Sequence, residues 1–442
     1  LPRLNGFELL MASYAMAHLK LDLLLTETGF KPTSNQRFRV YLTNSLEEHH
    51  QDTGTLFANW LSTEANEANH IKRDTPVMCV IGNPPYAVSS SNKGNWIMNL
   101  LEDYKKEPGG TEKLNERNSK VINDDYVKFL RYGQHFIEKN GSGVLAFINP
   151  HGFLDNPTFR GMRWHLLKTY DKIYTIDLHG NSKKKETAPD GSSDVNVFDI
   201  QQGVSINVFV KTGKKKENEL GKVFHFDLFG KREFKYDFLN KNSIKSVNFV
   251  ELPNKAPDYF MLQKDFELEA EYKSYFSLDE VFNSKVGGVK THRDNFIIDF
   301  DINDLKNRLS SFYNLELSNE ELVRSYRLSE KNEWLEQKRQ GSLESDFFQK
   351  IDYRPFDCRS IYFNPELIDR PRLPLMNNFF HSNIGMIFSR QATDSNWTAI
   401  QVSKFITDNR FHFSYKGIPV QAPLYLYPET TGQQTIEQSN ER

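Results

Sequence analysis

The sequence has little cysteine and no long apolar run. Its 442 residues include only two cysteines, Cys79 and Cys358, which form no metal-ligand spacing and cannot build a disulfide framework. We therefore expect a reducing, intracellular setting, and no bound metal. No apolar run approaches the length of a membrane span, and no signal peptide is recognisable, so we expect no membrane partner.

An excess of charge of either sign is also missing. Lys and Arg total 56 against 58 Asp and Glu, for a net charge of −2, and there is no polybasic tail. A nucleic-acid surface must then be a local patch rather than a field of the whole protein. A phosphate-binding loop of the Gly-x-x-x-x-Gly-Lys-Ser/Thr type is absent, which excludes a motor ATPase within this sequence.

Aromatic residues, by contrast, are abundant. They make up 13% of the chain, with 34 Phe and 19 Tyr. Such residues either fill large cores or stack on nucleic-acid bases. The length exceeds what one core usually supports, so two or more domains are expected.

The most informative stretch runs Cys79-Val80-Ile81-Gly82-Asn83-Pro84-Pro85-Tyr86. Val77 to Ile81 predicts a buried strand that stops at Gly82. Two prolines then stiffen the loop and leave the preceding carbonyls free to accept hydrogen bonds. Asn83 and the backbone supply acceptors beside the ring of Tyr86, which suits a planar substrate with an exocyclic amine. The alternative is a purely structural turn.

Around this loop the chain alternates strands and helices, which indicates a doubly wound α/β sheet. Glu8 ends a strand, Gly6 to Leu10, where nucleotide-binding folds place an acid against ribose hydroxyls, although it could equally cap the next helix. Asn44 follows the strand Arg37 to Leu42 and could contact a cofactor base or make a turn. Phe198 lies in a loop before the strand Val204 to Lys211, where an aromatic ring could face a substrate.

The sequence pattern changes near residue 235, where we place a domain boundary. Beyond it the alternation gives way to polar, aromatic-rich segments, a charged helical stretch from Asp301 to Lys338, and strand-like pieces at Ile384 to Ser389 and Phe411 to Ser414. Four arginines are candidates for contacts with DNA phosphates or base edges, with surface ion pairs as the alternative: Arg354, Arg370, Arg372 and Arg390.

The order of these segments resembles one family closely. The catalytic-type loop Asn83 to Tyr86 resembles that of amino-group methyltransferases of the gamma type. More narrowly, matching segments run almost end to end with type ISP restriction–modification enzymes. These segments are Gly6 to Met11, Asp124 to Phe129, Thr158 to Arg163, Asp177 to Asn181, Asn196 to Ile200, Tyr353 to Asp357 and Pro423 to Pro428.

The resemblance implies a Rossmann-like S-adenosylmethionine-dependent methyltransferase sheet in residues 1–235 and an α+β target-recognition domain in residues 236–442. Asn83, Pro84, Pro85 and Tyr86 would then be catalytic, with Tyr86 and Phe198 gripping a flipped adenine of double-stranded DNA. Glu8 and Asn44 would bind the cofactor, although the family often has Asp where Asn44 stands. The enzyme would act in a prokaryotic cytoplasm.

One family feature is missing. The glycine-rich loop that follows the first sheet strand should precede Gly6, and no such loop occurs in the sequence. Because the chain opens at Leu1 rather than Met, we expect the first strand, and nuclease and helicase-like domains that use ATP and Mg²⁺, to lie upstream. Three alternatives remain: a glutamine-amide methyltransferase acting on protein, an RNA methyltransferase, and a DNA-binding specificity module without transfer activity.

Overall fold

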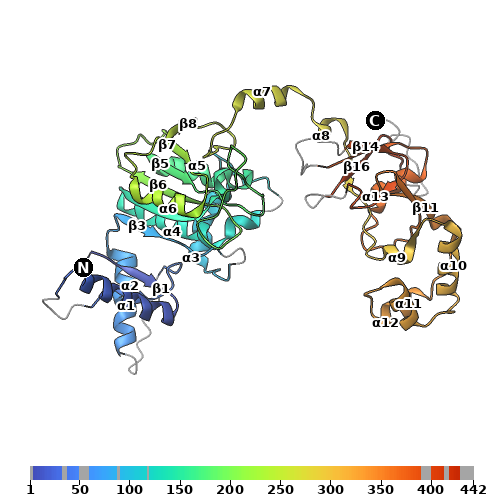
Figure 1. The fold of residues 1–442 in the computed structure, drawn as a ribbon, viewed down its shortest axis with the longest axis horizontal. Coiled ribbons are helices and arrows are strands. Elements are labelled where there is room, and N and C mark those ends of the chain that lie inside the picture. The colour runs from blue at the N-terminus through green and yellow to red at the C-terminus, as the bar shows by residue number, and fades with distance from the viewer. Residues whose placement is uncertain are drawn as a thin grey trace. The chain divides into compact units, whose positions relative to one another are not determined.

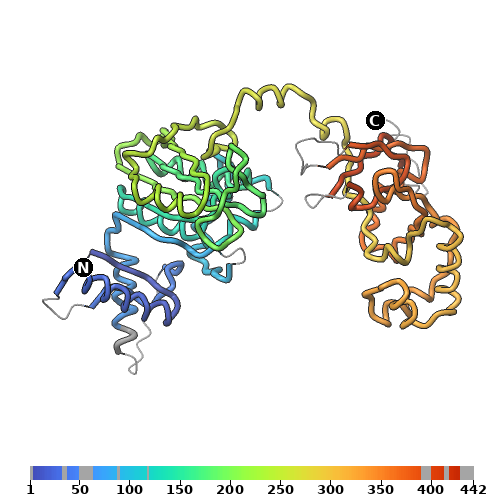
Figure 2. The backbone as a smooth tube through the Cα atoms, in the orientation of Figure 1, coloured from blue at the N-terminus to red at the C-terminus, as the bar shows by residue number. Residues whose placement is uncertain are grey.

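The computed structural model describes residues 3–31, 37–48, 59–86, 90–116, 119–389, 400–412 and 418–428, with the side chains of 59–62 excepted. The chain forms two compact units, Leu1–Phe266 and Glu267–Arg442 (Figures 1 and 2). The first unit extends past the boundary predicted at residue 235. Helix α6 (Arg232–Lys241) spans that position, and strand β8 (Val250–Leu252) still pairs with the sheet of the first unit.

A six-stranded mixed sheet forms the centre of the first unit, in the order β3-β4-β6-β5-β7-β8. Strand β6 is antiparallel to both of its neighbours, whereas β3 pairs parallel with β4 and β5 parallel with β7. The carboxyl ends of β3, β4, β5 and β7 therefore meet at one edge, together with the start of β6. The bounds are β3 (Cys79–Gly82), β4 (Gly143–Pro150), β5 (Lys172–Asp177), β6 (Val204–Lys211) and β7 (Lys222–Asp227).

Strand β3 is exposed rather than buried, which contradicts the sequence-based expectation. Ile81 is 81% exposed, and Cys79 and Gly82 are exposed as well. The reason is that β3 is a terminal strand of the sheet and pairs only with β4 among the described residues. A purely apolar run predicts a strand with neighbours on both sides, and that condition is not met here.

The strands predicted before residue 45 form a two-stranded parallel sheet of their own, and the predicted helix between them is present. Strand β1 (Gly6–Glu8) pairs with β2 (Val40–Leu42), and α1 (Met11–Glu27) and α2 (Asn59–Asp74) accompany them. Helix α1 buries none of its residues, and several of its large apolar side chains are more than half exposed. Within the described residues, β1 and β3 therefore each keep one unpaired edge.

Helices pack the main sheet into a core, as the sequence predicts. These are α3 (Asn95–Leu101), α4 (Asp125–Asn140) and α5 (Arg160–Thr169). Helix α4 is almost wholly buried, and Gly133 allows its close approach to β4, because an added Cβ would lie 2.6 Å from a methyl carbon of Leu145. The helix ends at Gly141, whose φ of 82° supports a left-handed C-terminal cap.

The second unit is α+β, with two four-stranded sheets in the orders β10-β12-β11-β15 and β14-β13-β16-β9. Their strands are β9 (Val286–Gly287), β10 (Ile298–Asp299), β11 (Phe348–Arg354), β12 (Asp357–Tyr362), β13 (Gly385–Phe388), β14 (Ile400–Ser403), β15 (Ile406–Thr407) and β16 (Val420–Pro423). The strand predicted at Phe411 to Ser414 is wrong over its described part, because Phe411 and His412 form a turn.

The charged stretch predicted as helical is three helices, α10 (Ile302–Tyr313), α11 (Asn319–Tyr326) and α12 (Asn332–Lys338). Leu315 and Arg327, at φ values of 60° and 52°, terminate the first two, because left-handed residues cannot continue a helix. Shorter helices complete the unit: α7 (Phe266–Ser274), α8 (Leu278–Val281), α9 (Asp294–Ile297) and α13 (Leu373–Met376). Among the described helices of either unit, none combines the length and apolarity of a membrane span.

Candidate functional site

The predicted catalytic loop leaves β3 at the edge where the strand ends gather. Asn83 is exposed and Pro84 is buried. The hydroxyl of Tyr86 donates to Asn83 Oδ1 at 2.7 Å and lies 3.2 Å from the carbonyl oxygen of Ile148 in β4. Burial raises the pKa of Tyr86 to about 12, so the phenol stays protonated. The side chain of Asn83 is thus oriented by its own loop.

Phe198, the second predicted aromatic, lies beside Tyr86. Their ring centroids are 6.5 Å apart, and the ring planes are inclined by 53°. The two residues are more than a hundred positions apart in the sequence, and they meet because β6 runs antiparallel to β4 and begins at the edge where β3 and β4 end. The structure therefore brings the predicted base-binding pair together.

The segment that carries Phe198 is fastened by α6. The buried side chains of Asp194 and Lys235 form an ion pair at 2.8 Å. Asp194 also accepts the backbone N–H groups of Gly180 and Gly230, at 2.6 and 2.7 Å. Arg232 donates to the carbonyl of Phe198 itself, at 3.1 Å. Every polar group of this buried pair is satisfied, which is the condition under which such a pair gives a defined geometry.

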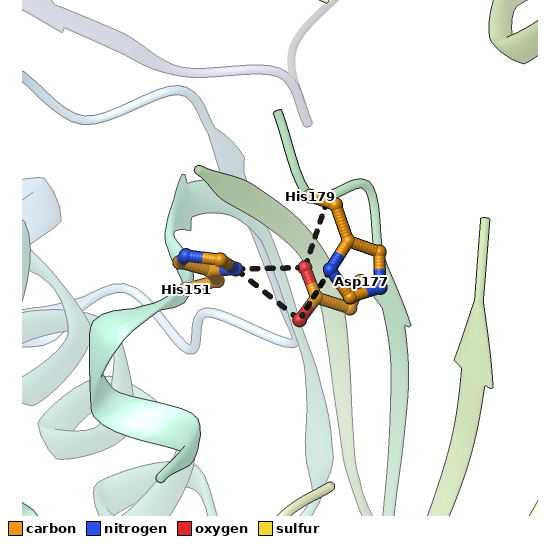
Figure 3. Close-up of side chains that lie close together, drawn as sticks. All are labelled: His151, Asp177 and His179. Carbon is orange, nitrogen blue, oxygen red and sulfur yellow. Dashed lines mark hydrogen bonds and ion pairs between the residues drawn. The ribbon is translucent and has the colours of Figure 1, made fainter. Parts of the chain in front are cut away.

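A cluster of histidines and carboxylates occupies the same edge of the sheet (Figure 3). His151 follows β4, and its Nδ1 lies 2.9 Å from Asp177 Oδ1 at the end of β5. His179 has a φ of 51°, and its Nε2 lies 2.8 Å from Asp227 Oδ1 at the end of β7. Its ring stacks on Phe229 at 3.8 Å. The cluster thus links the ends of three strands.

Within the described residues, His151, Asp177 and His179 are the group whose donor atoms lie close enough for a shared metal ion, all within 4.8 Å. The 2.9 Å contact between His151 and Asp177 is a hydrogen-bond distance, however, and each imidazole already faces a carboxylate. The geometry is that of a hydrogen-bond network between histidines and carboxylates. The expectation that no metal binds stays a prediction.

We expect this network to make the stability of the first unit pH-dependent. Burial by itself lowers the pKa of His179, but hydrogen bonds to Asp227 and Glu186, together with the charge of Asp177, outweigh it and raise the pKa to about 9. Because this lies above the unfolded value of about 6.5, the stabilisation is complete below about pH 6.5 and is lost as the pH rises through about 9. Its size is of order 3 kcal/mol.

Urea unfolding followed by hydrogen exchange in β5 and β7, at pH 6 and pH 9.5, measures this loss. His179→Gln should flatten the dependence over that interval. His70→Gln is the matched control, because His70 is 64% exposed and pairs across one helical turn with Asp74. Equal slopes for the wild type and His179→Gln would contradict the assignment.

The predicted cofactor residues lie at the carboxyl ends of β1 and β2, which are adjacent and parallel. Glu8 Oε1 accepts the backbone N–H groups of Leu9 and Leu10, at 2.9 and 3.1 Å; both precede α1, so these bonds order the strand-to-helix turn and do not cap the first turn of the helix. Asn44 accepts from the N–H of Leu46 and donates to Glu47. It lines a pocket of about 290 Å³ together with Leu46, Glu47, Ser91, Asn92, Lys93, Gly94 and Ile97.

Two buried lysines support this pocket, and sequence reasoning missed both. Lys72 of α2 donates to the carbonyl of Asn44 at 2.7 Å, and burial lowers its pKa to about 8. Lys128 of α4 donates to Ser90 Oγ and to the carbonyl of Asn92. From the sequence alone, Lys72 and Lys128 are each expected to be ordinary solvent-exposed lysines of a helix. The segment containing Lys128 stood out by resemblance alone, as did Asp177 to Asn181 and Asn196 to Ile200.

The predicted DNA-contacting arginines differ in environment. Arg354 pairs with the buried Asp408 at 2.7 Å. Arg370 keeps 57% of its side chain exposed, 3.6 Å from Asp369. Arg372 has a φ of 56°, and its Nε is buried without a hydrogen-bond partner in the described part of the chain. Arg390 lies outside the described residues. Arg354 and Arg370 thus each form an ion pair with an aspartate, which was the alternative to a contact with DNA.

Two family models match this chain. The Eco57I restriction-modification methylase model matches residues 6–183, and the type ISP C-terminal specificity domain model matches residues 280–442. No curated protein matches.

Three solved structures share the fold over almost the whole chain. The ATP-dependent type ISP restriction-modification enzyme LlaBIII bound to DNA is 21% identical, with a TM-score of 0.67 over 97% of this chain and 30% of its own. The DrdV–DNA complex is 20% identical (TM-score 0.63, 96% and 43%). A nuclease-deletion mutant of the type ISP enzyme LlaGI with a DNA substrate mimic is also 20% identical (TM-score 0.64, 96% and 36%).

The chain thus spans less than half the length of each of these proteins. Its two matched regions stand in the order methylase and then specificity domain, and they correspond to the two compact units. The chain thus contains an Eco57I-type restriction-modification methylase region, residues 6–183, ahead of a type ISP C-terminal specificity domain, residues 280–442.

Proposed function

We propose that this chain is the modification and target-recognition portion of a restriction–modification enzyme. It transfers a methyl group from S-adenosylmethionine to N6 of an adenine flipped out of double-stranded DNA. The observation that carries the proposal is the loop Asn83 to Tyr86, at a strand end inside the matched methylase region, with Phe198 of the same compact unit 6.5 Å from Tyr86. The neighbouring enzymes LlaBIII, DrdV and LlaGI were solved with DNA, which supports the choice of partner.

The loop suits an exocyclic amine because it offers acceptors and no strong base. Asn83 Oδ1 has two lone pairs, of which Tyr86 occupies one. The other can accept one N6 proton, and the Pro84 carbonyl can accept the second. These bonds favour a tetrahedral nitrogen, whose lone pair forms the new N–CH₃ bond as the C–S bond breaks. The extra N6 proton then leaves to water, so the residues mainly position the reactants.

The aromatic pair can hold a base outside the duplex. Adenine N6 cannot be reached within the base stack, so the nucleotide must be extruded. Tyr86 and Phe198 would contact its faces, and stacking contributes about 1–3 kcal/mol per base, comparable with the cost of unstacking. The ring inclination of 53° means that both rings cannot lie parallel to one base without a small rearrangement.

The residues at the ends of β1 and β2 fit the cofactor. S-adenosylmethionine supplies the activated methyl group. In the described residues only Oε1 of Glu8 is engaged with the backbone, which leaves Oε2 to accept ribose hydroxyls. The pocket beside Asn44 can take the adenine ring, with Asn44 held in place by Leu46, Glu47 and Lys72.

The β1–β2 pair and the six-stranded sheet that ends at β3 are not hydrogen-bonded to each other among the described residues. Strands β1 and β3 each have one unpaired edge in the described part of the chain, and Ile81 of β3 and several large apolar side chains of α1 are exposed. We propose that a further parallel strand, outside the described residues, completes a Rossmann-like sheet and carries the rest of the cofactor site. Nuclease and helicase-like domains using ATP and Mg²⁺, and a cytoplasmic location in a prokaryote, belong to the same proposal.

The second unit would read the DNA sequence, with arginines such as Arg370 on phosphates or base edges. Replacing residues 267–428 by those of a relative should then change the methylated sequence. An unchanged site would assign recognition elsewhere.

A labelled-methyl assay tests the proposed reaction. The intact enzyme is incubated with labelled S-adenosylmethionine and DNA, and the digested nucleosides are separated. We expect the label in N6-methyladenine. Label in a cytosine base, in RNA or in protein glutamine would refute the proposal and identify the alternative.

The open sheet edge favours one other candidate for this chain taken alone, a DNA-binding specificity module without transfer activity. Calorimetry with S-adenosylmethionine separates the two. Binding by this chain alone would count against the inert module.

A further inference from the structure

The hairpin between β11 and β12 ends in an unusual residue. Pro355 and Phe356 form its tip, and Phe356 has a φ of 64° and a relative exposure of 103%. A bulky side chain is sterically disfavoured in the left-handed region, where glycine would be at ease. A ring left wholly in water also gains nothing from burial. The folding of the second unit therefore gives no reason for phenylalanine at this position.

The stem beneath the tip is braced. The guanidinium groups of Arg354 and Arg359 both lie over the ring of Tyr353, at 4.0 and 4.1 Å from its centroid. Its hydroxyl donates to Asp294 at 2.9 Å. Arg354 and Arg359 are anchored in turn by Asp408 and Asp357, both at 2.7 Å. Phe356 is thus presented on a stem whose side chains have fixed positions.

Each of the two arginines also has guanidinium N–H groups that are not used in these contacts. Arg354 donates through Nη1, and Arg359 through Nε and Nη2. In the described part of the chain, Nη2 of Arg354 and Nη1 of Arg359 have no acceptor. Arg359 also covers the ring of Phe300, which is 69% exposed, at 4.1 Å. The tip therefore combines exposed π-faces with guanidinium donors.

This combination matches nucleic acid better than protein or membrane. Bases offer flat faces to an aromatic ring, and the phosphates beside them accept N–H donors. Apolar side chains inserted between base steps, phenylalanine and proline among them, are an established way to unstack and bend a duplex. The tip lies inside the matched specificity domain.

We propose that Phe356 is a wedge that enters the base stack of the bound duplex, with Arg354 and Arg359 on the flanking phosphates. The proposal rests on the proposed function only in taking duplex DNA as the ligand. It does not require methyl transfer. Since Phe356 would contact every target at one step, it would act through the deformability of that step rather than through hydrogen bonds to base edges.

The test uses the full-length enzyme and a duplex selected from a random pool by binding to it. 2-Aminopurine is placed at each position of the duplex in turn, and its fluorescence reports unstacking. The extruded adenine is itself expected to raise fluorescence at the methylated position, so the wedge predicts a rise at one further base step in the wild type. Phe356→Ala should abolish that rise and weaken binding about tenfold, whereas Phe356→Leu, which keeps an apolar wedge, should retain most of both.

Phe276→Ala is the matched control, because Phe276 is a 72% exposed phenylalanine of the same unit in the segment between α7 and α8. It should behave as the wild type. A second unstacked step that persists in Phe356→Ala, or no unstacked step besides the extruded adenine in the wild type, would overturn the wedge. Methyl transfer measured on the same samples distinguishes the two proposals. Transfer without unstacking at the step assigned to Phe356 refutes the wedge alone. Unstacking at that step without transfer refutes the reaction alone.

Discussion

Asn83→Ala is expected to lower methyl transfer to DNA by about 10²–10³-fold, the usual effect of removing one preorganised hydrogen-bonding group from a transition state. The bond from Asn83 to N6 strengthens as the nitrogen becomes tetrahedral, so kcat should fall with little change in KM for DNA. Since Asn83 is exposed on a proline-stiffened loop, folding should be unaffected. Single-turnover transfer of labelled methyl measures the loss of rate, and a DNA-binding assay on the same variant shows whether affinity is retained.

Two companion variants sharpen this result. Tyr86→Phe removes the hydroxyl that orients Asn83 at 2.7 Å but keeps the ring, so we expect a partial loss of rate and normal base extrusion. Tyr86→Ala removes the ring, so both extrusion and rate should fall. Asn140→Ala, at the end of α4 and away from the loop, is the control. Undiminished transfer by Asn83→Ala would eliminate the loop as the catalytic element.

Lys235→Met is expected to cost about 3–5 kcal/mol of stability, because it leaves the carboxylate of Asp194 buried without its counter-charge. Both side chains are fully enclosed, at 0% exposure. Asp194→Asn should also be destabilising, because it leaves the ammonium group of Lys235 buried without its counter-charge. The double variant should cost less than the sum of the two, because it leaves no buried charge. Chemical unfolding of the four proteins gives the coupling energy.

The same variants should loosen the segment that carries Phe198. Its N–H donates to Asn196 Oδ1 at 2.9 Å, and hydrogen exchange at this amide reports the local order. Lys241→Met is the matched control on the same helix, because the pair Lys241–Asp237 is 71% and 59% exposed and should contribute little. Equal costs for Lys235→Met and Lys241→Met would show that the buried pair does not hold the segment.

Sequence reasoning reached the elements of the first unit and the residues at its strand ends. Local pattern is enough for this, since Gly82-Asn83-Pro84-Pro85 ends a strand whatever surrounds it, and Gly141 ends α4 by its own conformation. It misjudged what depends on partners. Strand β3 has an apolar sequence but only one neighbour, and α6 belongs to the first unit through Arg232 and Lys235, which bond to residues some forty positions earlier.

The sequence by itself determined the chemistry offered at one loop: acceptors from Asn83, a stiff backbone, and the ring of Tyr86. These are properties of the residues and of their order. Only the tertiary structure decided that Phe198 meets Tyr86, that Asp194 and Lys235 hold that segment, and that Phe356 stands bare at a hairpin tip. Those facts follow from antiparallel register, long-range ion pairing and burial, which no local pattern encodes.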